Sequence, residues 1–418
     1  MPPAQPPQSR TVSRVMWFFA IVYAVEGIGQ AKSGIVWQPL TYFLKETQGW
    51  DAVKISVSLA IFDLPWVIKP LWGAISDFVP LFGFRRRPYL VLANIAAVLA
   101  FARVATLDTP AALIPAITAT SFAMAVSSTL CGALLVETGQ RHDASPGLVN
   151  QQWLFYNIAQ MAAVLLAGYL IEILPPAAAL HAAAWIAAAA PLSVVCSVWL
   201  IHEDRARIDL PALRARLAAL LSAFRSRNLW LAAGFLFLYY FSPGFGTPLY
   251  FEMTDRLGFS QGFIGVLSSI SAGGWILGGV LYKWQLHRLS QPALLRLSII
   301  GGVMTTLSYL LLDGPASAVT IWLLSGVAGM IAMIATLSLA AEACPQGAEG
   351  FAFAGLMSII NLATPLADTT GSVLYEHVFN RQIAPLIVLS AAATALVLVL
   401  VPLMVVRRPR LRAASQAT

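Results

Sequence analysis

The chain has 418 residues, of which 58% are apolar and only 11% are charged, about half the charged share of a soluble globular protein. Its mean hydropathy is +0.75, so it has too few charges to cover a water-exposed surface. These values exclude a soluble enzyme, a nucleic-acid-binding protein and a disordered chain, and they favour a polytopic membrane protein. The net charge of +7 does not indicate nucleic acid, because the basic residues lie in short loops and in the tail.

A membrane-spanning helix needs about 20 mostly apolar residues. Twelve segments meet this requirement, six on each side of a polar stretch at residues 202–228. We therefore predict an all-α membrane protein of two six-helix bundles, residues 1–201 and 229–418, joined by a cytoplasmic linker. The twelve segments are Val15–Phe43, Val53–Trp72, Tyr89–Leu107, Pro110–Val136, Leu148–Leu174, Ala177–Ile201, Leu229–Phe251, Phe263–Leu281, Pro292–Leu312, Ala316–Ala341, Phe351–Leu374 and Ile383–Val406.

The distribution of Lys and Arg predicts the orientation, because short cytoplasmic loops carry an excess of them. With the N-terminus inside, nineteen of the 26 basic residues fall in inner segments and four in outer segments. We expect a multi-pass protein of the inner cell membrane with both termini in the cytoplasm. In the linker, apolar residues recur at helical spacing between arginines from Leu213 to Phe224, which is typical of an amphipathic helix on the inner leaflet.

The chain resembles itself at an offset of 209 residues, half its length. Gln38–Trp50 aligns with Thr247–Phe259, and at the same offset Trp66 aligns with Trp275. A repeat of six spans predicts two similar bundles with a substrate site between them, near the middle of the membrane. Alternating access then requires only that one bundle rocks against the other.

The loop after the second span carries a recognisable motif, KPLWGAISDFVPLFGFRRRPYL at Lys69–Leu90. A glycine, an aspartate four residues later, then a glycine followed by basic residues resembles the signature of the major facilitator superfamily. The long spacing within SDxxPLFGxRRRPYL resembles the folate–biopterin transporter family. Similar motifs are YFLKE at Tyr42–Glu46, LPWVIKP at Leu64–Pro70 and FAFAGLMSIIN at Phe351–Asn361. The resemblance implies a twelve-helix transporter whose solute is a folate or pterin.

Ionisable side chains within spans indicate a cavity or a partner, because each costs about 3 kcal/mol at mid-membrane. Glu26 is the clearest example. An acid, an amide, a hydroxyl and two aromatic rings on one helical face suit a ligand wall, and Glu26 is also a candidate proton carrier. The alternative is a structural pair between Glu26 and Lys32, a residue that is also a candidate for binding a substrate carboxylate. The other residues on this face are Tyr23, Gln30, Ser33 and Trp37.

Three further spans carry polar candidates. In span eleven, Asp368 shares a face with Asn361 and Thr364, which predicts contact with ligand, water or another helix. Asp63, just before Pro65 in span two, is a candidate second coupling acid, and proline there is expected to bend the helix. Span five has a stripe that suits either a flat heterocycle or helix–helix hydrogen bonds. The stripe consists of Asn150, Trp153, Asn157 and Gln160.

Span seven contains YYFSPGFGTP at Tyr239–Pro248. Two prolines and two glycines in ten residues predict a broken or bendable helix, and therefore a gate. Tyr239, Tyr240 and Trp275 are candidates for ligand contact, with packing as the alternative.

At the inner face we predict a cytoplasmic gate, in which arginine–carboxylate bonds hold that side shut in one state and break in another. The alternative is that these arginines only control topology. The predicted gate consists of Gly73, Asp77, Arg85, Arg86, Arg87, Glu137 and Glu342.

No GK[ST] loop, GxSxG elbow or metal-ligand cluster occurs, and Cys131, Cys196 and Cys344 fit neither a disulfide framework nor a zinc site. We therefore expect no cofactor, no metal and no enzymatic activity. The leading hypothesis is a monomeric secondary transporter in the lipid membrane, coupled to protons. The alternatives are a different solute (a siderophore, a muropeptide or an amphiphilic drug) and a non-transporting membrane assembly factor on the same scaffold.

Overall fold

The computed structural model describes residues 7–30, 33–142, 145–201, 203, 205, 225–345 and 349–404, and these residues contain no strand. The linker helix predicted between Leu213 and Phe224 lies outside them. The α-helices are α1 (Pro7–Gly29), α2 (Trp37–Tyr42), α3 (Ala52–Val67), α4 (Lys69–Phe78), α5 (Arg87–Val104), α6 (Pro110–His142), α7 (Ser145–Ile173), α8 (Pro176–Ser197), α10 (Arg227–Tyr240), α11 (Gly246–Phe251), α12 (Gln261–Trp284), α13 (Gln291–Ser308), α14 (Pro315–Ala343), α15 (Glu349–Val373) and α16 (Ile383–Leu396). Short π-helices are η1 (Phe43–Thr47), η3 (Glu252–Arg256) and η6 (Leu374–Val378), and 3₁₀ segments are η2 (Val198–Leu200), η4 (Leu286–Arg288), η5 (Tyr309–Leu311) and η7 (Val397–Met404).

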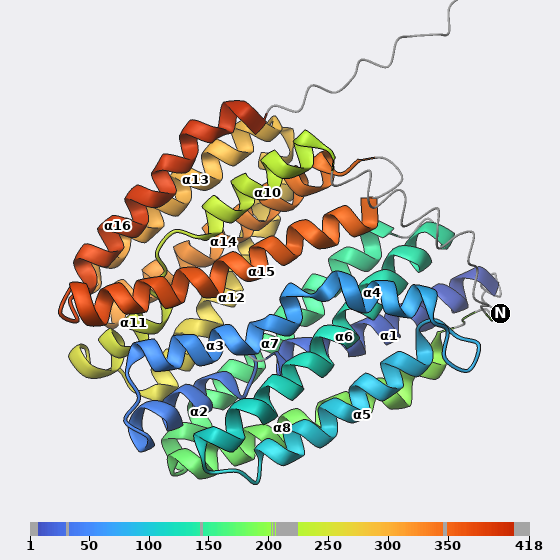
Figure 1. Cartoon of the computed structure of the whole chain (residues 1–418), viewed down its shortest axis with the longest axis horizontal. Coiled ribbons are helices and arrows are strands. Elements are labelled where there is room, and N and C mark those ends of the chain that lie inside the picture. Colours follow the sequence, from blue (N-terminus) through green and yellow to red (C-terminus); the bar gives the residue numbers. More distant parts are fainter. Residues whose placement is uncertain are drawn as a thin grey trace, which may run out of the picture.

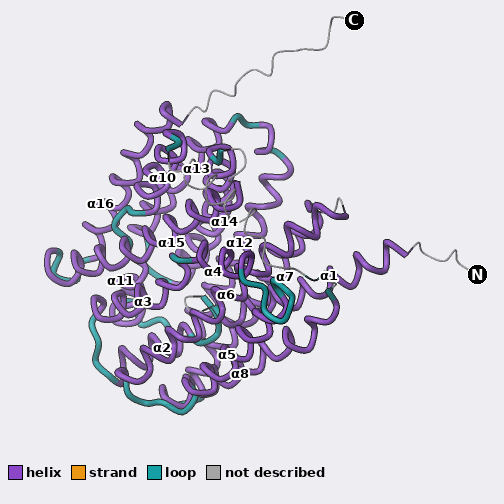
Figure 2. The backbone as a smooth tube through the Cα atoms, turned by 45° about the vertical axis from the view of Figure 1, so that its right-hand side comes forward, coloured by secondary structure: helices purple, strands orange, loops and turns teal. Residues whose placement is uncertain are grey.

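Helices α1–α8 form one bundle and α10–α16 form a second bundle beside it (Figure 1). The bundles meet where α7 packs on α12 and where α3 and α4 pack on α15. The tube in Figure 2 shows the same arrangement from a second direction, with helix as the main content of both bundles. Within the described ranges, nine helices are long and apolar enough to cross a membrane. The first, second and seventh predicted spans are each divided between two helices.

The divided first and second spans differ from the continuous spans that we predicted. The first is interrupted between Gly29 and Trp37, and the second at Ile68. Pro65 does not cause the second break, because α3 continues through it to Val67. The break instead precedes Pro70, which has no N–H to donate to the carbonyl four residues earlier. The predicted break in span seven is confirmed between Tyr240 and Gly246.

The internal repeat is present in the structure residue for residue at the ends of the first and seventh spans. Helix α11 and η3 follow α2 and η1 by 209 residues. Gly49 and Gly258, at the same offset, both have φ = 63°, a left-handed conformation that favours glycine. Equivalent local sequence therefore produces equivalent local structure in both bundles.

Glycines allow the close contact between α7 and α12, which joins the two bundles. A Cβ atom at Gly168 would lie 2.8 Å from the Gln261 carbonyl oxygen, and one at Gly265 would lie 2.7 Å from the Val164 carbonyl oxygen. Small residues permit such backbone approach between membrane helices. This interface therefore depends on the absence of side chains at both positions.

Candidate functional site

The break between α1 and α2 is held by polar residues, several of which the sequence placed on a ligand wall. The Gln30 Oε1 accepts hydrogen bonds from the Ser33 hydroxyl (2.9 Å) and the Tyr156 hydroxyl. Gln160 of α7 donates to the Ser33 carbonyl at 3.4 Å. Backbone groups freed by a helix break inside a membrane need such partners. Tyr156 was missed by the sequence analysis, since nothing in its local pattern distinguishes it from a packing aromatic.

A charged cluster lies beside this break, inside the first bundle. The Ser128 hydroxyl of α6 donates to Glu26 Oε1 at 2.9 Å and accepts from Lys69 Nζ at 3.2 Å. Lys69 Nζ also lies 4.4 Å from the centroid of the Trp66 ring, a cation–π distance. Glu26 Oε2 is buried and has no hydrogen-bond partner among the described residues. The cationic neighbour that the structure gives Glu26 is thus Lys69, whereas the predicted partner Lys32 lies outside the described residues.

An amide of the second bundle is hydrogen-bonded to this cluster. Asn361 of α15 donates from Nδ2 to the Trp66 carbonyl at 2.9 Å. That carbonyl lacks its helical partner, because the residue four positions later is Pro70. Asn361 of the second bundle therefore donates the hydrogen bond that the Trp66 carbonyl cannot receive within its own helix. Its predicted role in a substrate site stays a prediction, at a position where the two bundles meet.

Asp368 of α15 lies at the break between α10 and α11. Its Oδ1 accepts from the Thr247 backbone N–H (3.1 Å) and its Oδ2 from the Thr247 hydroxyl (2.6 Å). The neighbouring Gly244 N–H donates to the Ala367 carbonyl at 2.8 Å. A carboxylate that accepts these bonds stabilises the start of α11 in the way that an N-cap does. Both oxygens are thus engaged in holding the break, which favours a structural role for this acid.

Most aromatic candidates pack within one bundle. Tyr23 is 2% exposed and stacks on Phe19, while Tyr239 is 9% exposed and Tyr240 is hydrogen-bonded to Thr336 at 3.0 Å. Trp37 is half-buried against a hydrophobic cluster to which both bundles contribute. These positions are typical of packing, and contact with a ligand stays a prediction for each of them.

The remaining candidates are distributed along the helices. The Trp275 ring lies against Gly329 of α14. The rings of Trp153 and Tyr156 meet edge to face, with their centroids 5.9 Å apart. Asn157 is buried and donates to the Trp153 carbonyl one turn earlier. Asp63 and Thr364 lie in α3 and α15. The side chains of Asn150 and Asp77 are outside what the structure describes.

The arginine loop after α4 is tied within the first bundle. Arg86 forms an ion pair with Glu137 of α6 at 2.9 Å and donates to the Ser76 hydroxyl at 2.5 Å. The Glu203 carboxylate, at the start of the linker, accepts from the backbone N–H groups of Arg85, Arg86 and Arg87 at 2.7–2.9 Å. These contacts brace one bundle and do not cross to the other, so a state-dependent gate here stays a prediction. Glu203 was missed because its partners are backbone groups.

The remaining predicted gate residues lie close to this loop or at the equivalent helix end. Gly73 lies on α4, where a Cβ atom would be 3.7 Å from Thr129 of α6. Glu342 is exposed near the end of α14. Both positions are compatible with the predicted cytoplasmic gate.

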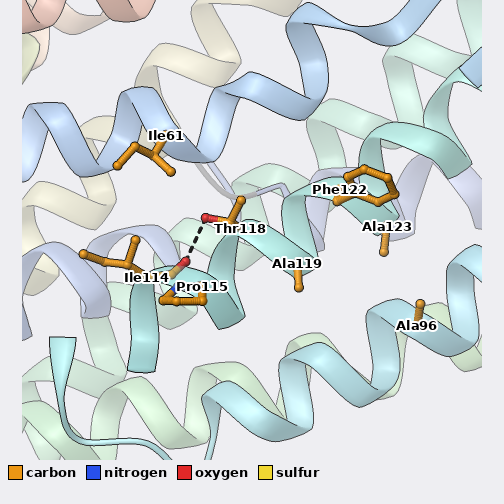
Figure 3. Close-up of a pocket in the computed structure, with 8 residues that line it drawn as sticks. All are labelled: Ile61, Ala96, Ile114, Pro115, Thr118, Ala119, Phe122 and Ala123. Carbon is orange, nitrogen blue, oxygen red and sulfur yellow. Dashed lines mark hydrogen bonds between the residues drawn. The ribbon is translucent and has the colours of Figure 1, made fainter. Parts of the chain in front are cut away.

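An apolar notch opens on the side of the first bundle, between α3, α5 and α6 (Figure 3). Its eight lining residues carry no charge, and its one hydroxyl, on Thr118, donates to the Ile114 carbonyl at 2.8 Å. Nothing in this notch can orient a polar solute, so the polar cluster around Glu26 is the better candidate for a transport site.

Comparison with known proteins decides the family. A profile of the BT1 family matches residues 28–414. The chain belongs to the BT1 family. It is similar to a folate-biopterin transporter of Synechocystis sp., with 29% identity over 371 residues that cover 84% of this chain and 73% of that protein. It is also similar to folate transporter 2 of Plasmodium falciparum, with 23% identity, covering 85% and 80% of the two chains.

Solved structures show the fold of this BT1-family protein. A D-xylose-proton symporter matches with a TM-score of 0.72 and 13% identity, covering 95% of this chain and 98% of that one. The nucleoside transporter NupG matches with a TM-score of 0.67 and 16% identity, covering 94% and 98%. The predicted major facilitator fold is confirmed. The BT1-family protein is therefore a multi-pass membrane transporter.

At the end of the BT1-family protein farthest from its arginine loop, hydrogen bonds join the two bundles in what we call the polar seam. Lys45 Nζ lies 2.5 Å from Asp255 Oδ1 and 2.6 Å from Glu46 Oε1. Gln38 donates to the Gln261 carbonyl at 2.7 Å. The other seam contacts join the Ala52 N–H to Glu376 (3.2 Å) and the Gly262 N–H to Glu172 (2.9 Å).

Lys45 of the seam stays charged across the physiological pH range. Burial by itself lowers the pKa of Lys45, but hydrogen bonds to Asp255 and Glu46 outweigh it and raise that pKa above its ordinary value. A raised lysine pKa means that the contribution to stability is fully present below the unfolded value and is lost only as pH rises through the folded value. Lys45 is therefore not a pH sensor near neutrality.

Reversing one charge of the seam should weaken it, and exchanging both should restore it. Lys45→Asp or Asp255→Lys places like charges together, while the double exchange recreates an opposite pair. Because the Asp255 side chain is 56% exposed, we expect a modest shift of about 0.2–1 kcal/mol, or roughly 1.5- to 5-fold in a two-state equilibrium. Labelling of a cysteine at the seam with a membrane-impermeant thiol reagent measures this shift. Failure of the double exchange to restore protection would contradict the pairing.

If Asp368 caps α11, replacing either Asp368 or its partner Thr247 should lower stability by a similar amount. Asp368→Asn and Thr247→Val should each lower stability by about 1 kcal/mol, and the double variant should cost little more than either one. Denaturation of the purified transporter, followed by tryptophan fluorescence, measures these values. A loss of proton coupling in Asp368→Asn with unchanged stability would instead support the proton-carrying role predicted from sequence.

Proposed function

We propose that this protein is a proton-coupled secondary transporter that moves a folate- or pterin-like solute across the inner cell membrane by alternating access. The observation that carries the proposal is Glu26, whose buried Oε2 has no hydrogen-bond partner in the described part of the chain and lies beside the bridge from Ser128 to Lys69. An unsatisfied carboxylate oxygen within a membrane marks a functional group by default. It is a place where a proton can be bound and released.

Alternating access is supported by the arrangement of the bundles. The first and seventh spans are broken at equivalent positions of the two bundles, and broken helices are typical of transporters built from repeats. The polar seam joins the bundles at one end, and rocking must break it to admit solute from that side. The arginine loop at the other end supports a cytoplasmic location for both termini. We propose that the transporter acts as a monomer, because each chain contains both bundles.

The solute class follows from the relatives, which are named as transporters of folate or of folate and biopterin. Amides, hydroxyls and a lysine around the breaks suit a polar or anionic heterocycle. Asp63 and Asp368 are the other proposed coupling acids, of which Asp368 is the weaker because Thr247 engages both of its oxygens.

Uptake into proteoliposomes tests the proposal. We expect folate to accumulate only when an inward proton gradient is imposed, and a protonophore to abolish accumulation. Parallel arms contain a neutral pterin, a siderophore, a muropeptide and an amphiphilic drug. Accumulation of one of these in place of folate would overturn the solute class, and accumulation that ignores the gradient would overturn proton coupling. If none of these solutes is transported, the alternative of a non-transporting membrane assembly factor is favoured.

A further inference from the structure

The proposed function names no ligand group for Lys69, although Ser128 connects this residue to Glu26. It begins α4 at the second-span break, in a motif that the sequence analysis associated only with the family. Its ammonium group has three N–H donors, and among the described residues it makes one hydrogen bond, to Ser128 at 3.2 Å. The start of a helix also favours negative charge. A lysine there has donors to spare for an anion.

Ser128 separates the two charges of the cluster. Its hydroxyl donates to Glu26 and accepts from Lys69, while the carboxylate and the ammonium group form no direct ion pair in the part of the chain that the structure describes. With Glu26 ionised, the cluster has no net charge. When Glu26 takes up a proton, the cluster has a net charge of +1 inside the membrane, which is costly until an anion compensates it.

We propose that Lys69 binds a carboxylate group of the transported solute, and that the charge on Glu26 decides whether it does so. This inference rests on the proposed function and adds the solute group and the residue that binds it. A proton on Glu26 and a carboxylate at Lys69 each make the other more favourable, by linkage. The proton enters with the anion, so one carboxylate and one proton move together without net charge.

Among the residues that the structure describes, no other neighbour of Glu26 competes for this role. The titratable groups that interact with it are Lys69 from α4, Cys131 from α6, Tyr156 from α7 and Tyr23 from its own helix. A thiol and two phenols are ordinarily neutral between pH 5 and 8. Glu26 is therefore the group whose charge changes, and Lys69 is the cation that responds.

The cluster also has a route to the second bundle. Trp66, whose ring lies under the Lys69 ammonium group, holds Asn361 of α15 through its carbonyl. An anion bound at Lys69 sits three residues from this contact between bundles. The same site can therefore bind solute and influence how the bundles meet.

A generic carboxylate probe tests the inference without knowledge of the natural solute. Purified full-length protein is heated with millimolar benzoate or with neutral benzamide. For Glu26→Gln, which leaves Lys69 uncompensated, we expect benzoate to raise Tm by about 2 °C at both pH 5.5 and pH 8. For the wild type, the rise should appear at pH 5.5 and be much smaller at pH 8. Benzamide should have no effect on either protein.

The double variant Glu26→Gln/Lys69→Gln is the decisive control, since it should lose the benzoate response. Lys69→Arg, which keeps the positive charge, should keep the response to benzoate at pH 5.5. This variant still tests the inference if Glu26→Gln fails to fold. An unchanged benzoate response in the double variant, or no response in either Glu26→Gln or the wild type at pH 5.5, overturns the inference. A benzoate response that depends on Lys69, found without folate uptake, would overturn only the proposed solute. Folate uptake that is unchanged in Lys69→Gln would overturn only the inference.

Discussion

Replacing Glu26 by glutamine should reduce proton-driven accumulation by more than tenfold, while exchange of solute across the membrane continues. Glutamine has nearly the same shape and can still accept from Ser128, which donates to Glu26 Oε1. It cannot take up a proton, so a pH gradient has no group to act on. Accumulation under a pH gradient and counterflow without one, both in proteoliposomes, separate the two properties.

The matched control is Glu46→Gln, the same change at an acid whose side chain is 42% exposed in the polar seam. It should leave proton-driven accumulation within about twofold of the wild type, because exposed ion pairs contribute little. Wild-type accumulation in Glu26→Gln would show that another acid carries the proton, and Asp63 would then be the next candidate to test.

Leucine at Gly265 should abolish transport by separating the two bundles along α7 and α12. Even a Cβ atom there would lie 2.7 Å from the Val164 carbonyl oxygen and 3.3 Å from the Gly168 Cα. These are backbone atoms that cannot rotate away, so the helices must move apart, and overpacking typically costs about 1–3 kcal/mol or more. We expect normal membrane insertion and more than tenfold loss of uptake. Disulfide formation between Lys45→Cys and Asp255→Cys reports whether the seam still closes.

Gly273, on the same helix, provides the control. A Cβ atom at this position meets nothing within 4 Å, so Gly273→Leu adds the same bulk to α12 without obstructing α7. It should retain both uptake and seam crosslinking. Equal losses in Gly265→Leu and Gly273→Leu would mean that the effect comes from leucine in this helix and not from the interface.

Local sequence predicted those features whose cause is local. Prolines and glycines in Tyr239–Pro248 predicted the break in the seventh span, and the repeat predicted that equivalent segments would fold alike. The break in the first span was missed because its segment, Gln30–Val36, contains no proline. That break depends on Tyr156 and Gln160 of α7, which supply hydrogen bonds from outside the segment.

Partners distant in sequence explain the other differences. The alternative that paired Glu26 with Lys32 rested on their closeness along the chain, and Lys32 lies outside the described residues. Within them, Ser128 connects Glu26 to Lys69, 43 residues away. Asp368 was predicted to contact ligand, water or another helix. Local sequence did not indicate which, and the structure shows that it caps α11, which begins over 120 residues earlier. A helical stripe shows which residues share a face but not which helix that face meets.

The amino-acid sequence by itself determined that this chain is a helical membrane protein with a transporter fold, because burial in lipid requires long apolar helices, and a repeated pattern of such helices specifies repeated bundles. Only the tertiary structure decided which charges meet. Charged groups inside a membrane are stable only with partners, and those partners come from whichever helices pack together, so the bridge from Glu26 through Ser128 to Lys69 exists only once α1, α4 and α6 are assembled.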